Sequence, residues 1–340
     1  MSSAVIRPTS SRTPWWLWLN VLSLDAPLLA VLWQAALAHV HQVKLLSGCY
    51  WALGLAVWVV YLTERTLDGF GEPDPARASA RQLFYRRFRH LFAWVIIPAV
   101  AGGLGYVALT EIPSGLMWRG LGLAFLVAMY LLHYPARPHR WLYWAGNMIA
   151  GPIGLFIIWM VPEHPYRYLW LIALATLLVM SFCRQFVAGF RMPPKEILCG
   201  YLFAVGCSLG VNFFTVDLQT SSFAGAETLL LAVLCAVNAI GIACYEKKRS
   251  LSDQDSDGIM EIWPDIVRVY PVLLLTLAGA AMMVLYQQPA GQMSWYIGAI
   301  LLSTALLGVV HNWAGRLSPD MVRVLADMAL VTPLLWLAVG

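Results

Sequence analysis

The chain has 340 residues, of which 60% are hydrophobic and only 12% are charged, and its formal net charge is +4. A soluble domain carries about twice that charged fraction. A chain this apolar cannot enclose its hydrophobic surface in one aqueous core, so the composition predicts an integral membrane protein. The small net charge gives no reason to expect a nucleic-acid partner.

The apolar segments predict an all-α, polytopic bundle of transmembrane helices that forms a single integral membrane domain over residues 1–340. The spans must be helical, because lipid cannot satisfy free backbone groups. The first apolar run is too long for a signal peptide and lacks a small-residue cleavage site, so we expect it to be retained. About eleven spans are expected, at residues 15–39, 47–68, 91–110, 116–134, 141–161, 167–184, 197–216, 226–245, 266–286, 292–311 and 321–339.

Basic residues gather in alternate loops along the chain. By the positive-inside rule these loops are cytoplasmic, which places the N-terminus in the cytoplasm and the C-terminus on the opposite side. We therefore expect a multi-pass protein of the inner (cytoplasmic) membrane. The basic loops contain Arg77 to Arg89, Arg137 and Arg140, Arg184 to Lys195, Lys247 to Arg249, and Arg316 to Arg323.

Two acidic residues stand at the predicted cytoplasmic end of the second span. Glu64 and Asp68 are four residues apart, so their carboxylates share one helix face. Such a pair suits a divalent cation with oxygen ligands, in particular Mg²⁺ that bridges to a phosphate. The alternative is a helix end whose carboxylates reach water and pair with Arg65 or a loop arginine.

A second polar region begins in the eighth predicted span. Asn238 lies two helical turns before Glu246 on roughly the same face, and a mid-span Asn prefers the bundle interior. The segment 253–258 matches the start of an EF-hand loop, but Pro264 stands where the bidentate Glu belongs. Asp253 and its neighbours are therefore interpreted as a solvated acidic loop, with a calcium site as the alternative.

The remaining polar features fit more than one role. The arginines in residues 81–90 suit a phosphate or a diphosphate, and equally anionic lipid headgroups. The six cysteines form no CxxC pair and suit helix packing. Five polar residues inside spans suit contacts between helices or a proton relay, and these are Asp25, His133, His311, Asn312 and Asp327.

In the arrangement of its two acidic points, the chain resembles the UbiA superfamily of intramembrane prenyltransferases. That family has nine spans and two Asp-rich motifs, which hold Mg²⁺ on a prenyl diphosphate in a cavity on the cytoplasmic side. Here Glu64-x-x-x-Asp68 ends the second span, and three spans follow the region from Asn238 to Asp253. The segment 132–140 with Asn147 and Gly151 also looks like the family's stretch after its fourth span.

The chain departs from the family pattern at defined places. Val60 stands where the first motif opens with Asn or Asp, Glu64 replaces an Asp, and Asn238 and Glu246 stand in place of an Asp-rich run. Two extra spans precede the second motif, and they are interpreted as a helical hairpin inserted at residues 141–184 into a nine-span core.

The resemblance implies a prenyltransferase that moves an isoprenyl group from a prenyl diphosphate to a lipophilic acceptor in the membrane. Its predicted catalytic residues are Glu64, Asp68, Asn238 and Glu246, and its predicted Mg²⁺ ligands are Glu64, Asp68, Glu246 and Asp253. From the residues themselves we expect a clamp for the diphosphate and aromatic faces for the allylic cation. These residues are Arg86, Arg87, Arg89, Lys247 and Lys248 for the clamp, and Tyr61, Tyr134 and Tyr245 for the cation.

Two other functions fit the same chain. A non-catalytic relative would bind lipid or an isoprenoid as a subunit of a membrane complex. A transporter would need a polar path through the bilayer. The expected partners are therefore membrane lipids, with a prenyl diphosphate and an acceptor for an enzyme, or partner proteins of a membrane complex.

Overall fold

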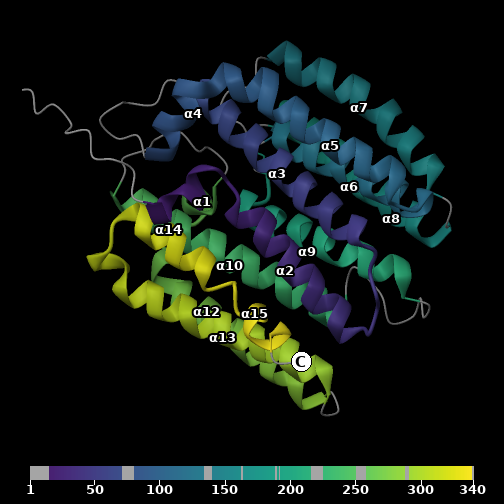
Figure 1. Cartoon of the computed structure of the whole chain (residues 1–340). Coiled ribbons are helices and arrows are strands. Elements are labelled where there is room, and N and C mark those ends of the chain that lie inside the picture. Colours follow the sequence, from purple (N-terminus) through teal and green to yellow (C-terminus); the bar gives the residue numbers. More distant parts are fainter. Residues whose placement is uncertain are drawn as a thin grey trace, which may run out of the picture.

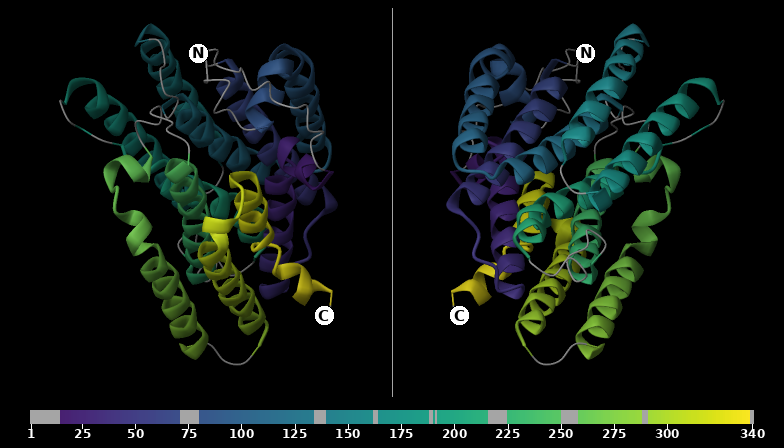
Figure 2. Two further views of the ribbon diagram at one scale, coloured as in Figure 1. Left: turned by 90° about the vertical axis from the view of Figure 1, so that its left-hand side faces the viewer. Right: turned by 90° about the vertical axis from the view of Figure 1, so that its right-hand side faces the viewer.

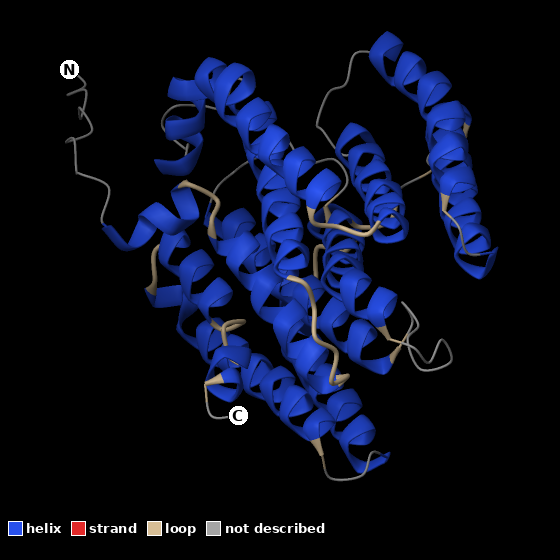
Figure 3. Cartoon of the chain, turned by 45° about the vertical axis from the view of Figure 1, so that its right-hand side comes forward, coloured by secondary structure: helices blue, strands red, loops and turns tan. Residues whose placement is uncertain are grey.

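The computed structural model describes residues 15–70, 80–133, 140–161, 164–187, 190, 192–215, 225–249, 258–287 and 291–338. Every regular element in these residues is helical, as Figure 3 shows. The predicted all-α fold is therefore confirmed. The predicted site residues Tyr134 and Asp253 lie outside the described residues, and so do Arg77, Arg137, Asp255 and Asp257.

Several helices are long and apolar enough to cross a membrane. Six such helices occur in the described part of the chain, at Arg81–Thr110, Ser114–Leu132, Lys195–Phe214, Ala226–Tyr245, Ile266–Gln287 and Met293–Arg316. The pair Trp15–Val21 and Asp25–Val40 forms a seventh candidate that is bent by 76°. The chain is therefore a multi-pass membrane protein.

The centre of the bundle consists of α2 (Asp25–Val40), α9 (Lys195–Phe214) and α10 (Ala226–Arg249). Helix α9 packs on both α2 and α10, and many of the buried apolar side chains of the main core come from these three helices. Gly200 allows the closest approach, because a Cβ atom there would lie 2.6 Å from the backbone oxygen of Ala232. Small residues at such points let membrane helices pack backbone against backbone.

Two groups of helices flank this centre on opposite sides (Figure 1). One group contains α3 (Ser47–Phe70), α4 (Ala80–Leu91), the π-helical turn η2 (Phe92–Ile96), α5 (Ile97–Thr110), α6 (Ser114–His133), α7 (Arg140–Met160) and α8 (His164–Phe186). The other contains α11 (Ile259–Ile262), α12 (Ile266–Gln287), α13 (Gln292–Trp313), η3 (Ala314–Arg316), α14 (Pro319–Met328) and α15 (Pro333–Leu337). Figure 2 shows α12 and α13 as an antiparallel hairpin along one side of the molecule.

Several predicted spans do not correspond to one long apolar helix in the structure. Among the side chains that the structure describes, α7 and α8 contain the apolar stretches Met148–Met160 and Trp170–Cys183. The predicted last span, 321–339, is divided between α14 and α15, and ten residues of α14 rise only about 15 Å. The first predicted span is broken at residues 22–24, after the short segments η1 (Trp15–Leu17) and α1 (Trp18–Val21).

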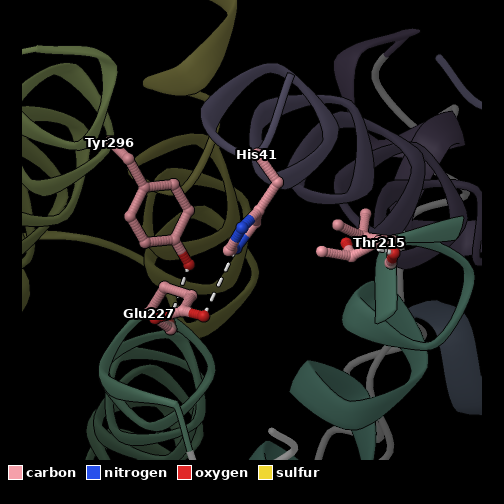
Figure 4. Close-up of polar contacts among 5 residues, drawn as sticks. His41, Thr215, Glu227 and Tyr296 are labelled. Carbon is pink, nitrogen blue, oxygen red and sulfur yellow. Dashed lines mark hydrogen bonds and ion pairs between the residues drawn. The ribbon is translucent and has the colours of Figure 1, made fainter. Parts of the chain in front are cut away.

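A polar cluster joins three helices at the end of the bundle where α2 ends and α10 begins. His41 Nε2 lies 3.3 Å from Glu227 Oε1, and the Tyr296 hydroxyl donates a hydrogen bond of 2.9 Å to the Glu227 carbonyl oxygen. In Figure 4, the side chains of His41 and Tyr296 both point at Glu227 in the first turn of α10, and Thr215 lies to one side. Both His41 and Glu227 are largely shielded from solvent, so this contact fixes the order of the three helices at that end.

Candidate functional site

A cavity of about 300 Å³ lies at the other end of the bundle, where α3, α6 and α10 end and α4 and α9 begin. It is bounded by both sides of the break between α1 and α2, by the end of α3, and by the starts of α4 and α9. The last half of α10, α11 and the end of α14 complete it. The cavity therefore joins chain segments from residue 20 to residue 330.

The cavity wall contains ionisable side chains of both signs. Four are acidic, namely Asp25, Glu64, Glu196 and Asp327, and four are basic, namely Arg65, Arg81, Lys195 and Arg323. The apolar part of the wall includes Leu29, Phe203, Ile242 and Leu330. Charged groups are costly at membrane depth and usually face a bundle interior or a cavity. This lining is therefore suited to a ligand with a charged head and an apolar body.

The break between α1 and α2 positions Asp25. Ser23 has a positive φ of 53°, and this turn lets α2 start in a new direction. Asp25 is the first residue of α2, and its Oδ1 accepts a hydrogen bond of 3.0 Å from the Ala26 N–H. A carboxylate is favoured there, because the N-terminus of a helix has a positive partial charge. The Asn20 side chain donates a second hydrogen bond, of 2.7 Å, to Asp25 Oδ2.

Asp327 reaches the same place from α14. Its carboxyl group hydrogen-bonds with that of Asp25, and its Oδ1 accepts a hydrogen bond of 3.2 Å from Asn238 Nδ2. The sequence motifs placed Asn238 in a candidate catalytic region, and the structure brings it onto Asp327.

The first acidic motif is divided by the end of α3. Glu64 and Tyr61 line the cavity, as does Arg65. Asp68 does not line it: its side chain is 56% exposed and lies 3.8 Å from Arg65 Nη1. The i, i+4 spacing therefore places the two carboxylates on one side of α3 without placing both in the cavity.

Glu196 connects the start of α9 to the segment after α10. Its Oε2 accepts a hydrogen bond of 3.1 Å from the Ile259 N–H, and the residue is only 4% exposed. Gly258 and Met260 next to this contact also line the cavity. The sequence analysis missed Glu196 as a site residue, although an adjacent Lys-Glu pair at the start of an apolar helix was a usable signal.

The predicted arginine clamp lies outside the cavity lining. Arg87 stacks on Phe88 and Arg89 on Phe70, with guanidinium-to-ring distances of 5.4 and 5.3 Å, and Arg86 is half-buried on α4. The cavity instead contains Arg65, Arg81, Lys195 and Arg323. Arg81 belongs to the segment 81–90 that was considered for a phosphate, whereas Arg65, Lys195 and Arg323 were missed because only the three-dimensional arrangement brings them together.

The second predicted region is only partly described. Glu246, Lys247 and Lys248 belong to the last turn of α10, and their side chains lie outside the described part of the structure. Tyr245 hydrogen-bonds with the ring and the carbonyl oxygen of His311 and is not part of the cavity lining. No group of three metal-ligating side chains capable of holding an ion occurs among the described residues.

No protein-family model matches the chain, and neither a curated protein nor a solved structure is detectably similar to it. The cavity and its charged lining are therefore the basis for a functional proposal.

Proposed function

We propose that this protein is an intramembrane prenyltransferase, a divergent relative of the UbiA superfamily, that transfers an isoprenyl group from a prenyl diphosphate to a lipophilic acceptor. The observation that carries the proposal is the single cavity that joins Glu64 from the first acidic motif with Asn238 from the second. Four cationic side chains and an apolar wall stand beside them in the same cavity. A diphosphate with an isoprenyl tail matches this division between charge and hydrocarbon.

The basic residues support the binding of a diphosphate. Arg65, Arg81, Lys195 and Arg323 would donate hydrogen bonds to its oxygens and stabilise the charge that develops as it leaves. Tyr61 and Tyr130 line the cavity and could face an allylic cation through their rings. Because Leu29, Phe203 and Ile242 provide an apolar surface, they would hold the first isoprene units.

The charges in the cavity also support a role for Mg²⁺. Among the described residues the lining has four acidic and four basic side chains, so its formal net charge is zero, or +1 when Asp25 and Asp327 share one proton. A bound diphosphate would add negative charge that these residues do not compensate. Mg²⁺ is commonly held by one or two carboxylates together with substrate phosphates. Glu64 is the carboxylate that would hold it, and the ion would supply charge neutralisation at the departing diphosphate.

The proposal includes a fold of about eleven spans with a nine-span core and an inserted hairpin at residues 141–184. The cavity lies at the end of the bundle where α3 and α10 end and α4 and α9 begin, and the positive-inside rule assigns the basic residues near these helix ends to the cytoplasm. We therefore propose the inner membrane, with the N-terminus in the cytoplasm and the C-terminus on the opposite side.

One observation favours a second function, a non-catalytic subunit that binds lipid or an isoprenoid. Asp68 lies outside the cavity lining, and the described residues contain no preformed metal site. A lipid-binding relative would keep the apolar part of the cavity and would bind isoprenoids without Mg²⁺.

Calorimetric titration of the detergent-purified protein with geranylgeranyl diphosphate tests the proposal. Binding should require Mg²⁺ and should weaken strongly in Glu64→Gln, while a separate Asp68→Asn variant measures whether the second acid contributes. The matched control is Asp265→Asn, because Asp265 is an exposed carboxylate outside the cavity. Binding that ignores both Mg²⁺ and Glu64→Gln would refute the enzyme and favour the lipid-binding subunit.

A further inference from the structure

We propose that the hydrogen-bonded carboxyl groups of Asp25 and Asp327 accept the proton of the acceptor substrate, and that the acceptor donates this proton from a hydroxyl or amine group beside Asn238. This inference rests on the proposed prenyl transfer and specifies the other half of the reaction. It assigns these two residues a chemical role separate from diphosphate binding.

Two carboxamide side chains hold the carboxyl groups of Asp25 and Asp327 in place. Each carboxyl group is held by its own carboxamide, since Asn20 donates to Asp25 and Asn238 donates to Asp327. A hydrogen bond between two carboxyl groups requires one proton for the pair. A pair that holds one proton can still accept a second. It can therefore act as a base, and its orientation is fixed before any substrate binds.

The side chain of Asn238, next to the carboxyl pair, has an acceptor atom without a hydrogen-bond donor. Asn238 is 8% exposed and lines the cavity, and no described residue donates a hydrogen bond to its Oδ1 atom. In this orientation of the amide, its Nδ2 atom donates to Asp327 and its Oδ1 atom is the end without a donor. A buried acceptor atom without a donor is costly unless a ligand satisfies it. A hydroxyl or amine group of a bound acceptor would provide that donor next to the carboxyl pair.

The other charged groups of the cavity are suited to parts of the reaction other than proton transfer. The cations suit the leaving diphosphate, and Glu64 suits Mg²⁺, whereas Glu196 is occupied by the Ile259 N–H. The charged side chains that share the cavity with the pair are Glu64, Arg65, Arg81, Lys195, Glu196 and Arg323.

The proposed step balances in atoms and charge. The bond between the prenyl carbon and the bridging oxygen breaks, and its electron pair leaves with the diphosphate. The oxygen or nitrogen of the acceptor forms the new bond to that carbon. Its proton passes to the Asp25–Asp327 pair, which then holds two protons and later releases one to solvent. Water can take the acceptor's place, in which case the product is the prenyl alcohol.

The test separates departure of the diphosphate from capture of the prenyl group. Geranylgeranyl diphosphate with a heavy-oxygen label at the bridging position reports reversible C–O cleavage as scrambling of the label. Tritiated geranylgeranyl diphosphate, supplied with water alone or with a membrane lipid extract, reports prenyl alcohol or prenylated lipid. Both are measured for the wild type, Asp25→Asn, Asp327→Asn, Glu64→Gln and the exposed control Asp265→Asn.

We expect both Asn variants to bind the diphosphate and scramble the label as the wild type does, while product formation falls on the order of 100-fold, the usual contribution of a general base. Glu64→Gln should lose scrambling and product together. Product formation at the wild-type rate in either Asn variant would overturn the inference, as would loss of binding in both. A wild type that scrambles the label yet forms no product from water or lipid would also overturn it, and would leave the diphosphate site intact. A wild type that neither binds nor scrambles refutes the proposed function itself.

Discussion

Replacement of Gly200 by alanine should force α9 and α10 apart. A Cβ atom at this position would lie 2.6 Å from both the Ala232 oxygen and the Ala236 nitrogen, whereas ordinary contact begins at 3.4 Å. The shortfall is 3.4 − 2.6 = 0.8 Å. Both obstacles are backbone atoms of α10, so no side chain can rotate away and the helices themselves must move.

The expected cost follows from this geometry. Overpacking of a close-packed interior costs about 1–3 kcal/mol, and the better helix propensity of alanine returns at most about 1 kcal/mol. The net destabilisation is therefore about 1–2 kcal/mol. At about 2–4 °C per kcal/mol, the melting temperature should fall by roughly 2–8 °C. Gly200 also lines the cavity, so binding of geranylgeranyl diphosphate should weaken as well.

The measurement is thermal unfolding in detergent, followed by the fluorescence of the sixteen tryptophans. Gly279→Ala in α12 is the matched control, because nothing lies within 4 Å of a Cβ atom placed there. The control should melt at or above the wild-type temperature. If Gly200→Ala and Gly279→Ala melt together, the close contact between α9 and α10 does not limit the fold.

Two further results are expected. A double-mutant cycle with His41→Ala and Glu227→Ala should show coupling, because either single change leaves a largely buried partner without its contact, at about 1–3 kcal/mol. Trp33→Phe should cost about 1 kcal/mol, since the indole N–H of this buried residue donates to the Leu330 carbonyl oxygen at 3.1 Å.

The sequence predicted the helices better than the site. Apolar length and periodicity determine where a membrane helix can form, and the predicted spans 197–216, 226–245 and 266–286 lie within a few residues of α9, α10 and α12. The break at residues 22–24 was missed although Asn20, Ser23, Asp25 and Pro27 interrupt the apolar segment there. An acidic residue followed closely by proline is typical of the first turn of a helix, so the sequence contained a signal for a new helix start at Asp25.

The site was harder to predict because its residues come from many helix ends. Glu64 and Asn238 were identified from motifs, and both line the cavity. Asp25 and Asp327 were recognised as costly intramembrane acids, but their pairing depends on how α14 packs against α10 and on where α2 begins. The loop arginines were over-valued for a related reason. Density of charge along a sequence does not show which guanidinium groups turn inward.

The composition of the cavity distinguishes the candidate functions more sharply than its size does. An isoprenoid or lipid tail requires only an apolar wall. The eight described ionisable side chains of the lining would then cost desolvation free energy that no contact with the ligand compensates. A diphosphate uses the four cations, and its own charge then requires a further cation, for which Glu64 is placed. We assign the carboxyl pair in the remaining polar corner, formed by Asn20, Asp25, Asn238 and Asp327, to the second substrate and not to the diphosphate. The carboxyl pair can act as a base only when a second substrate that carries a transferable proton binds beside it. An enzyme with two substrates therefore accounts for more of this lining than a lipid-binding subunit does.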